Sequence, residues 1–201
     1  MLLQNLTVDN FGVFRGHHSF DLAPRSENGR THHLTIFSGH NGAGKTTLFQ
    51  AMIFALHGAA YFEDTAVSQK YNNFILSRIH RFPNLGKHTS TDESRVTLSF
   101  QYVKSGQIYN IQVERQWKKQ GRGVRENLTV LKDGQPPEVD PVDYQIWIND
   151  FISPEVGQIC FFDAEHLDAL ANRDQQSTVL RDTLVRLLGL DWGQHLEVDL
   201  E

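Results

Sequence analysis

The chain has 201 residues, a formal net charge of −5, and ordinary fractions of apolar (39%) and charged (21%) residues. Such a composition is typical of a globular protein and excludes a chain that is disordered throughout. The single cysteine, Cys160, excludes a disulfide framework, and no apolar run reaches the roughly 20 residues of a membrane helix. The start of the chain lacks the basic and apolar parts of a signal peptide, so we expect a cytoplasmic protein with no membrane contact.

In chain order, the first predicted elements are two strands joined by a turn. Residues 2–8 carry apolar residues with polar breaks, and residues 10–12 (Asn-Phe-Gly) have the composition of a turn. A second short strand is expected to end near Phe20 and Leu22. Residues 24–30 are polar and contain Pro, Ser, Asn and Gly, so we expect a loop there.

The next segment predicts a strand, a glycine-rich loop and a helix. Residues 33–38 are β-branched and apolar in part, which favours a buried strand. Residues 45–57 are apolar nearly all round and therefore predict a buried helix. Gly58 is placed to end that helix.

The middle of the chain changes from a helical to a strand pattern. We expect a further helix within residues 61–81 and a Pro-, Gly- and Ser-rich loop over residues 82–94. Alternation with a period of two then predicts an antiparallel meander of three strands. These strands are expected at residues 95–102, 108–117 and 127–131.

Beyond the meander the pattern predicts a short helix at residues 143–151, a buried strand at residues 158–162 and a longer helix at residues 166–190.

The clearest motif is Gly39-His-Asn-Gly-Ala-Gly-Lys-Thr46, which matches the P-loop pattern G-x-x-x-x-G-K-[ST] in full. In such a loop, glycines allow successive backbone N–H groups to turn inward around an anion, and the following helix directs its positive end at the phosphates. We therefore expect contacts with the phosphates of ATP. The expected residues are Gly39, Asn41, Gly42, Ala43, Gly44, Lys45, Thr46 and Thr47.

Within this loop, two side chains have distinct expected roles. Lys45 supplies a positive charge for the β- and γ-phosphates and is a catalytic candidate. The hydroxyl of Thr46 suits Mg²⁺, which prefers oxygen ligands. Thr47 is expected to add a contact with the α-phosphate.

These residues resemble the SMC-like ATPases, a group that includes SbcC and RecF. The likeness begins at Asn10-Phe11-Gly12 and continues through the P-loop and residues 48–58. Within the group it is greatest for the DndD family, ATPases linked to DNA phosphorothioation. The segments that carry this closer likeness are residues 11–16, 113–117, 124–128, 160–165, 170–171 and 187–191.

The resemblance implies an α/β fold of the P-loop NTPase class and the ABC-ATPase head type, with the antiparallel meander added to it. In that family the chain leaves the head into a coiled coil and returns with a signature motif and a Walker B pair. Residues 1–201 lack a Ser-Gly-Gly-Gln-like signature. We therefore expect them to be the N-terminal lobe of a head, with a helical and loop insertion at residues 61–94 and a helical segment at residues 166–201 that leads toward a coiled coil.

The resemblance also implies partners and an activity. The expected function is binding of Mg-ATP, with hydrolysis in the complete head, in DNA phosphorothioation. The expected partners are the C-terminal half of the same head, a second head that sandwiches ATP, other phosphorothioation proteins, and DNA through the complex. We expect residues 1–201 alone to hydrolyse ATP poorly.

Two carboxylates near the C-terminal end are candidates for metal and water chemistry. Asp163 follows an apolar run, and Glu165 lies two residues further on. By pattern alone this is a Walker B strand, in which Asp163 holds the metal and Glu165 polarises the attacking water. The resemblance instead places the segment at the Q-loop, and an ordinary strand that ends in solvated carboxylates is a third interpretation. DndD proteins usually have Gly where this chain has Ala164.

Basic residues supply two further hypotheses. The resemblance places Arg15 against the ATP phosphates, while a surface turn arginine is the alternative. Because the net charge is negative, contact with DNA would need a local basic patch. Such a cluster surrounds a predicted hairpin tip beside Trp117, where a solvated hairpin with a packed Trp117 is the favoured interpretation. Its members are Arg115, Lys118, Lys119, Arg122 and Arg125.

Other functions remain open from the sequence. One is the ATPase subunit of an SbcC-like nuclease or DNA-defence complex, which would differ mainly in its partner. Another is a self-contained P-loop kinase or GTPase, although the chain has no Asn-Lys-x-Asp motif for guanine. A third is a structural clamp that is gated by ATP without turnover.

Overall fold

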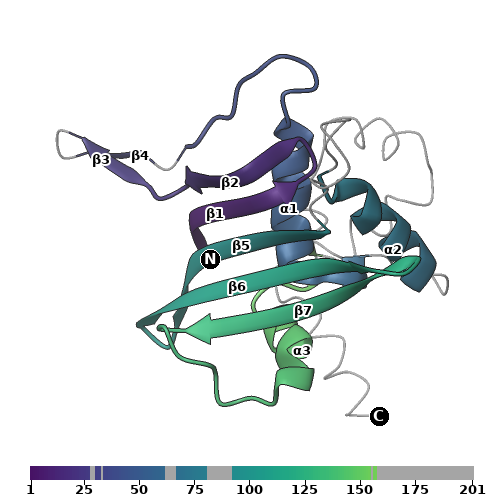
Figure 1. The fold of residues 1–201 in the computed structure, drawn as a ribbon. Helices are drawn as coiled ribbons and strands as arrows, with labels where there is room; N and C mark the ends of the chain where they lie inside the picture. Colours follow the sequence, from purple (N-terminus) through teal and green to yellow (C-terminus); the bar gives the residue numbers. More distant parts are fainter. Residues whose placement is uncertain (28–29, 33, 62–66, 81–91, 155, 158–201) are drawn as a thin grey trace, which may run out of the picture. The chain divides into compact units, whose positions relative to one another are not determined.

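The computed structural model describes residues 1–27, 30–32, 34–61, 67–80, 92–154 and 156–157 (Figure 1). The chain divides into two compact units, Met1–Phe151 and Ile152–Glu201. Nearly all described residues belong to the first unit, and the architecture below is that of this unit. The strand expected at residues 158–162, the helix expected at residues 166–190 and the candidates Asp163 and Glu165 lie outside the described residues.

The framework of the first unit is a five-stranded antiparallel sheet with the order β2-β1-β5-β6-β7. Its strands are β1 Leu2–Phe11, β2 Phe14–Asp21, β5 Glu93–Lys104, β6 Gln107–Gln120 and β7 Gly123–Lys132. The two expected N-terminal strands and the expected three-strand meander are therefore confirmed, and the strands of the meander are longer than the sequence pattern predicts. Turns at Ser105–Gly106 and Gly121–Arg122 join the meander, as the short polar breaks between its strands require.

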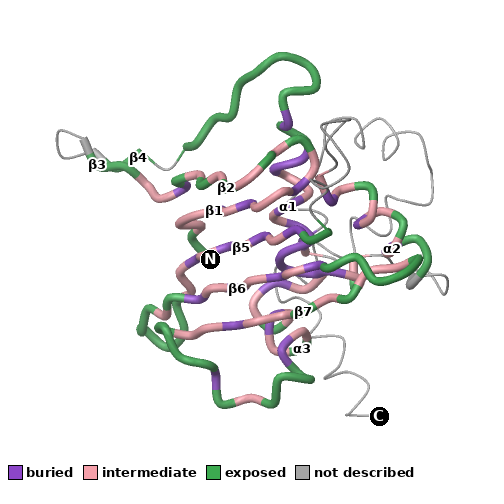
Figure 2. Tube along the Cα trace, viewed as in Figure 1, coloured by how far each residue is buried: buried purple, intermediate pink, exposed green. Residues whose placement is uncertain are grey.

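Alternation along the strands gives this sheet one apolar and one polar face. One row of cross-strand neighbours is entirely apolar and consists of Phe20, Leu6, Leu98, Val113 and Val130. The adjacent row, on the opposite face, is entirely polar and consists of Ser19, Thr7, Thr97, Glu114 and Thr129. An antiparallel sheet with one solvated face has this pattern. The buried positions recur along the strands and along the first helix (Figure 2).

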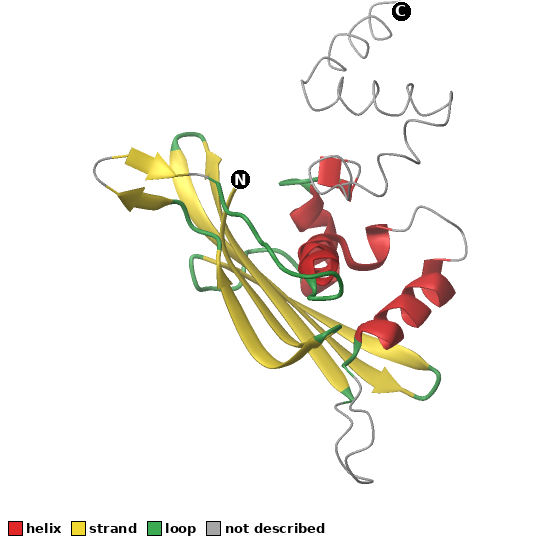
Figure 3. Cartoon of the chain, turned by 90° about the horizontal axis from the view of Figure 1, so that it is seen from above, coloured by secondary structure: helices red, strands yellow, loops and turns green. Residues whose placement is uncertain are grey.

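The helices cover the apolar face of the sheet (Figure 3). They are α1 Lys45–His57, α2 Val67–Arg78 and α3 Tyr144–Asn149, with 3₁₀ turns η1 Gly58–Tyr61 and η2 Pro141–Asp143. Helix α1 packs on β1, β5 and β6, whereas α2 and α3 pack on β7. Aromatic rings fill the space between the layers: Phe11 lies 5.9 Å from Trp117 and Phe54 stacks at 4.5 Å on Phe74, both between ring centroids.

The helical predictions hold in the described residues. Helix α1 spans the expected residues 45–57, and it ends at Gly58, whose N–H donates to the carbonyl of Phe54. The helix expected within residues 61–81 is α2, and the one expected at residues 143–151 is α3 with the turn η2 before it. None of the described helices is long and apolar enough to cross a membrane.

Two expectations are wrong. Residues 24–30 contain a small hairpin, β3 Arg25–Glu27 with β4 Arg30–His32, rather than an irregular loop. The buried strand expected at residues 33–38 is absent from its described part, because residues 34–40 have no regular secondary structure, and Leu34 and Ile36 are 78% and 75% exposed. Apolar, β-branched composition favours a strand only where a neighbouring strand satisfies its backbone, and no described strand pairs with this segment.

Candidate functional site

The glycine-rich loop leads directly into helix α1. Gly42 and Gly44 have φ angles of +82° and +105°, in the left-handed region that favours glycine. Gly44 is the N-cap of α1, and the first intrahelical hydrogen bond runs from the N–H of Leu48 to its carbonyl. The N–H groups of the first helical turn have no carbonyl within the helix to bond, so they are available to an anion placed at this end.

The side chain of Lys45 folds back and bonds to the backbone at the start of the loop. Its Nζ donates to the carbonyl of Gly39 at 2.8 Å and to that of His40 at 3.0 Å. The N–H of Ala43 also donates to the carbonyl of His40, at 3.1 Å, which makes a tight turn inside the loop. The ammonium group of Lys45 is therefore held against the backbone of the loop, while the residue is exposed to solvent.

The turn between β1 and β2 packs against this loop at two glycines. A Cβ at Gly44 would lie 2.6 Å from Val13 Cγ2, and a Cβ at Gly12 would lie 2.4 Å from Thr47 Cγ2. Real Cβ atoms do not approach so closely, so glycine at both positions allows the turn to touch the start of α1. Thr47 is buried in this contact.

The end of α2 holds the same turn from its other side. The N–H of Gly12 donates to the carbonyl of Arg78 at 2.5 Å, and the N–H of His80 donates to the carbonyl of Asn10 at 2.9 Å. The ring nitrogen Nδ1 of His80 lies 2.8 Å from the carbonyl oxygen of Gly12. Burial lowers the pKa of the Arg78 guanidinium, which stacks 4.8 Å above the ring centroid of Phe74.

An open cleft of about 690 Å³ lies beside this turn. It is lined by Gly12, Val13, Asn73, Leu76, Ser77, Ile79 and His80. Two of these residues, Gly12 and Val13, also approach Thr47 and Gly44 at the start of α1.

The remaining predicted site residues fall into two groups. Thr46 has an exposed side chain in the first turn of α1, and Arg15 is exposed within strand β2 rather than in a loop. Its carbonyl accepts from His18 Nε2 at 2.8 Å. Asp163 and Glu165 lie outside the described residues, and among the described residues no group of three or more His, Cys, Asp and Glu could hold a metal ion. The roles of all four residues remain predictions.

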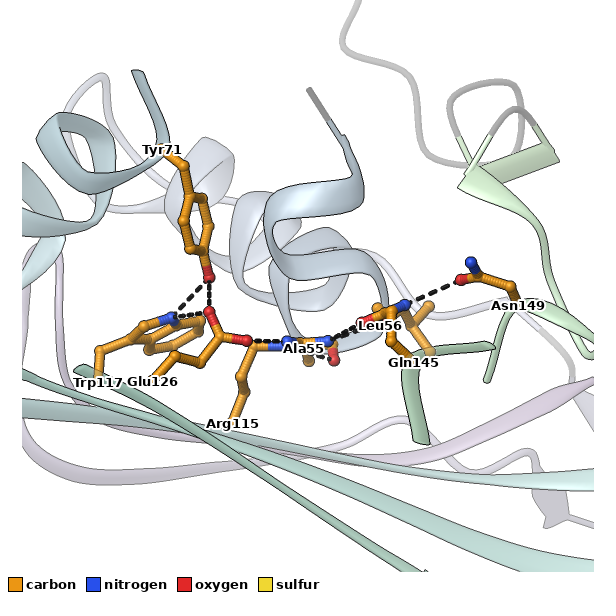
Figure 4. Close-up of polar contacts among 8 residues, drawn as sticks. All are labelled: Ala55, Leu56, Tyr71, Arg115, Trp117, Glu126, Gln145 and Asn149. Carbon is orange, nitrogen blue, oxygen red and sulfur yellow. Dashed lines mark hydrogen bonds and ion pairs between the residues drawn. The ribbon is translucent and has the colours of Figure 1, made fainter. Parts of the chain in front are cut away.

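A buried polar network at the opposite end of α1 was not expected from the sequence (Figure 4). Its centre is Arg115 of β6, which is only 2% exposed. The guanidinium donates from Nε to the carbonyl of Ala55 and from Nη2 to that of Leu56, each at 3.3 Å. It also donates to Glu126 on β7 and to Gln145 on α3.

The network continues through Glu126 to α2. Its carboxylate accepts from the phenol of Tyr71, and from Trp117 Nε1 at 3.1 Å. Burial, followed by the charge of Glu126, raises the pKa of the Tyr71 phenol, so the phenol stays protonated and keeps donating. The network thus joins α1, α2, α3, β6 and β7.

The basic cluster expected at the hairpin tip is smaller than predicted. Arg115 and Trp117 are buried beneath the helices, so they do not belong to the tip, and the interpretation of Trp117 as a packed residue is confirmed. The other four residues, Lys118, Lys119, Arg122 and Arg125, are exposed. The alternation along β6 distinguishes the buried from the exposed basic residues. Arg115 lies an even number of residues from Ile111 and Val113, so its side chain is on the same apolar face of the sheet.

Two comparisons with known proteins bear on the family of this chain. No curated protein matches the chain significantly. A family model described as an AAA domain matches residues 5–172, which is more than half of the chain and includes the loop, both ends of α1 and all of the five-stranded sheet except the first residues of β1. The chain therefore belongs to the family of AAA domains of SMC/SbcC-like ATPases.

Proposed function

We propose that the chain binds Mg-ATP at residues 39–47 and forms the nucleotide-binding part of an SMC-like ATPase. The observation that carries the proposal is the position of Lys45, whose ammonium group bridges the Gly39 and His40 carbonyls across the loop at the N-terminus of α1. An anion that entered the loop would meet this charge and the N–H groups of the first helical turn together. The AAA-domain match supports nucleotide as that anion.

Each residue of the loop has a separate task in this proposal. Lys45 exchanges its two carbonyl partners for the β- and γ-phosphate oxygens, which it stabilises as a positive charge. Glycines 42 and 44 keep the backbone N–H groups directed at the phosphates, and Thr47 adds a contact with the α-phosphate. The exposed hydroxyl of Thr46 would hold Mg²⁺, which would offset the negative charge of the phosphates. Arg15, Asp163 and Glu165 are proposed to complete the surroundings of the γ-phosphate.

The cleft beside Gly12 suits the other end of the nucleotide. It is lined by Gly12 and Val13, which also approach Thr47 and Gly44, and base pockets in proteins are usually concave and partly apolar. Leu76 and Ile79 provide apolar contacts in the cleft, whereas Asn73 and Ser77 provide polar groups. The base and ribose would therefore lie between α2 and the β1–β2 turn.

The affinity of the protein for Mg-ATP tests the site. Lys45→Ala removes the charged donor, so we expect an affinity loss of more than about 1.5 kcal/mol, roughly tenfold, by isothermal titration calorimetry. Lys104→Ala, at the exposed end of β5, is the matched control and should bind like the wild type. Unchanged affinity in Lys45→Ala would refute nucleotide binding at this loop.

For the biological process, we propose ATP-driven DNA phosphorothioation in a complete head. The support is the likeness of residues 11–16, 113–117, 124–128 and 160–165 to the DndD family. The proposed partners are the returning half of the head, a second head across ATP, DNA, and other phosphorothioation proteins. An SbcC-like nuclease or DNA-defence complex is the second candidate, because such a complex would use the same AAA domain. Affinity capture of the full-length protein from its host distinguishes the two by the enzymes that accompany it.

Hydrolysis by residues 1–201 alone is proposed to be negligible. Phosphoryl transfer needs a positioned water and charge stabilisation on all sides of the γ-phosphate as well as a P-loop. Residues 1–201 lack the Ser-Gly-Gly-Gln-like signature that the returning half of an SMC-like head supplies. Steady-state phosphate release should therefore be at background, whereas robust turnover that Lys45→Ala abolishes would favour a self-contained NTPase with Asp163 and Glu165 as a Walker B pair.

A further inference from the structure

The phosphate-binding loop is attached to the N-terminal end of a helix that is fixed at both of its ends. At the first end, the β1–β2 turn touches Thr47 and Gly44 without room for another carbon atom. At the second end, Arg115 donates to the carbonyls of Ala55 and Leu56. These contacts lie near the two ends of a helix of 13 residues, which is about 20 Å long.

The contact at the second end is directional, whereas buried apolar side chains pack along the middle of the helix. Leu48, Ala51, Ile53 and Phe54 are buried, and such contacts stabilise the helix without strict dependence on direction. Hydrogen bonds require defined distances and angles. The bonds from Arg115 therefore restrict sliding and rotation of α1 along the sheet in a way that its apolar face does not.

Arginine at this position is better suited to placing the helix than to stabilising the fold. A buried ion pair such as Arg115 with Glu126 is often no more stable than an apolar pair of the same volume, because both charges lose their hydration. Arg115 nevertheless engages the last helical turn, where unpaired carbonyls and the helix dipole favour a cation. Gly58 allows this close approach, since a Cβ there would lie 2.5 Å from Arg115 Nη1.

We propose that Arg115 is a positioning residue of the nucleotide site, which it serves by holding the far end of the P-loop helix. The proposal rests on nucleotide binding at residues 39–47. Gln145 shares the task from α3, because its Nε2 donates to the Leu56 carbonyl at 3.1 Å and its oxygen accepts from Arg115. When Arg115 is lost, α1 shifts or rotates, and the loop at its N-terminus no longer presents its N–H groups in one arrangement.

The test separates positioning from stability with a compensated variant. Arg115→Met leaves the Glu126 carboxylate without its ion pair and should lower the melting temperature. Arg115→Met combined with Glu126→Gln removes both charges, while the Gln amide oxygen can still accept from Trp117 or Tyr71, so the melting temperature should recover in large part. Because the bonds to Ala55 and Leu56 remain absent, Mg-ATP affinity should stay about tenfold weaker, a typical coupling between linked sites.

Two further variants keep the test informative if the Met variants fail to fold. Arg115→Lys retains the charge but loses the fork that reaches both carbonyls, and Gln145→Ala leaves the pair with Glu126 in place. Both should fold, and both should weaken Mg-ATP binding in calorimetry. Arg122→Met makes the same change at an exposed arginine of the β6–β7 turn and should bind like the wild type.

The outcomes distinguish this inference from the proposed function. Absence of Mg-ATP binding by the wild type, or an unchanged Lys45→Ala, removes the nucleotide site and the inference with it. Suppose instead that the wild type binds Mg-ATP and Lys45→Ala does not. If the Arg115→Met/Glu126→Gln variant then recovers both stability and wild-type affinity, only the positioning role of Arg115 is overturned. Wild-type affinity in Arg115→Lys and Gln145→Ala overturns it equally.

Discussion

At the scale of single residues, the closest constraint on the site is the distance between Gly12 and Thr47. The turn and the helix start touch there, so any side chain at Gly12 displaces either Thr47 or the turn. Gly12 also has a φ angle of +59°. Gly16 shares the positive φ, at +74°, but a Cβ there would meet nothing within 4 Å. The two glycines therefore separate backbone strain from steric conflict.

Gly12→Ala is expected to cost more stability than Gly16→Ala. Both changes place alanine in the left-handed region, which costs about 1 to 2 kcal/mol, and Gly12→Ala adds about 1 to 3 kcal/mol of overpacking. Only Gly12→Ala should also weaken Mg-ATP binding, because it moves Thr47. Urea unfolding and calorimetry measure the two effects, and equal losses of stability would contradict the close approach.

The pKa of Tyr71 predicts a dependence of stability on alkaline pH. The folded state raises the pKa above the ordinary value of 10.0, so the folded state holds the phenol proton more tightly than the unfolded chain does. The resulting stabilisation is fully present below pH 10 and is lost as the pH rises above it. Tyr71→Phe should lower the unfolding free energy near pH 8 but make it decline less steeply in alkali. Identical pH slopes in wild type and variant would argue against the network around Glu126.

At the scale of elements, the β6–β7 hairpin places two positive charges opposite each other on its solvent-exposed face. Lys118 faces Arg125 directly across the hairpin, and it faces Glu93 on its other side. Like charges directly opposite each other destabilise a sheet. Arg125→Glu would place Lys118 between two carboxylates and should raise the unfolding free energy by about 0.5 kcal/mol. The gain should shrink in high salt, and Arg125→Gln, which only removes the repulsion, should give a smaller gain.

How much of the fold follows from the sequence also differs between elements. Strands β5 and β6 and helix α1 could be predicted because a period of two, or an apolar helical run, continues through most of each element. Residues 34–38 could not, since their conformation depends on a partner strand rather than on their own composition. Within the site, the P-loop pattern locates residues 39–47. The charge of Arg115 predicts an exposed residue, whereas its position in the alternation of β6 predicts a buried one, and the structure follows the alternation. The hydrogen-bond partners of Arg115 on α1 and α3 lie 59 residues before it and 30 residues after it in the sequence. No local sequence pattern could therefore predict these contacts.

At the scale of the whole molecule, the exposed apolar segment before the P-loop should govern solution behaviour. Leu34 and Ile36 are largely exposed and Phe37 partly so, and contiguous exposed apolar residues favour association. Leu34→Ser combined with Ile36→Ser should increase the monomer fraction in sedimentation velocity. Val103→Ser combined with Ile108→Ser is the control, because these residues are 61% exposed at the β5–β6 turn. An equal increase in the control would assign association to general surface hydrophobicity.

The pairing of β1 with β5 has a consequence for the order of folding. It joins residues 2–9 to residues 95–101, so the glycine-rich loop and α1 lie inside a long closed segment of chain. The hairpins of β5, β6 and β7 join near neighbours and can form rapidly, whereas closing the long segment carries a larger entropic barrier. Since the β1–β2 turn shapes the loop only after β1 has docked, the capacity to hold nucleotide should be the last property to return when the chain refolds.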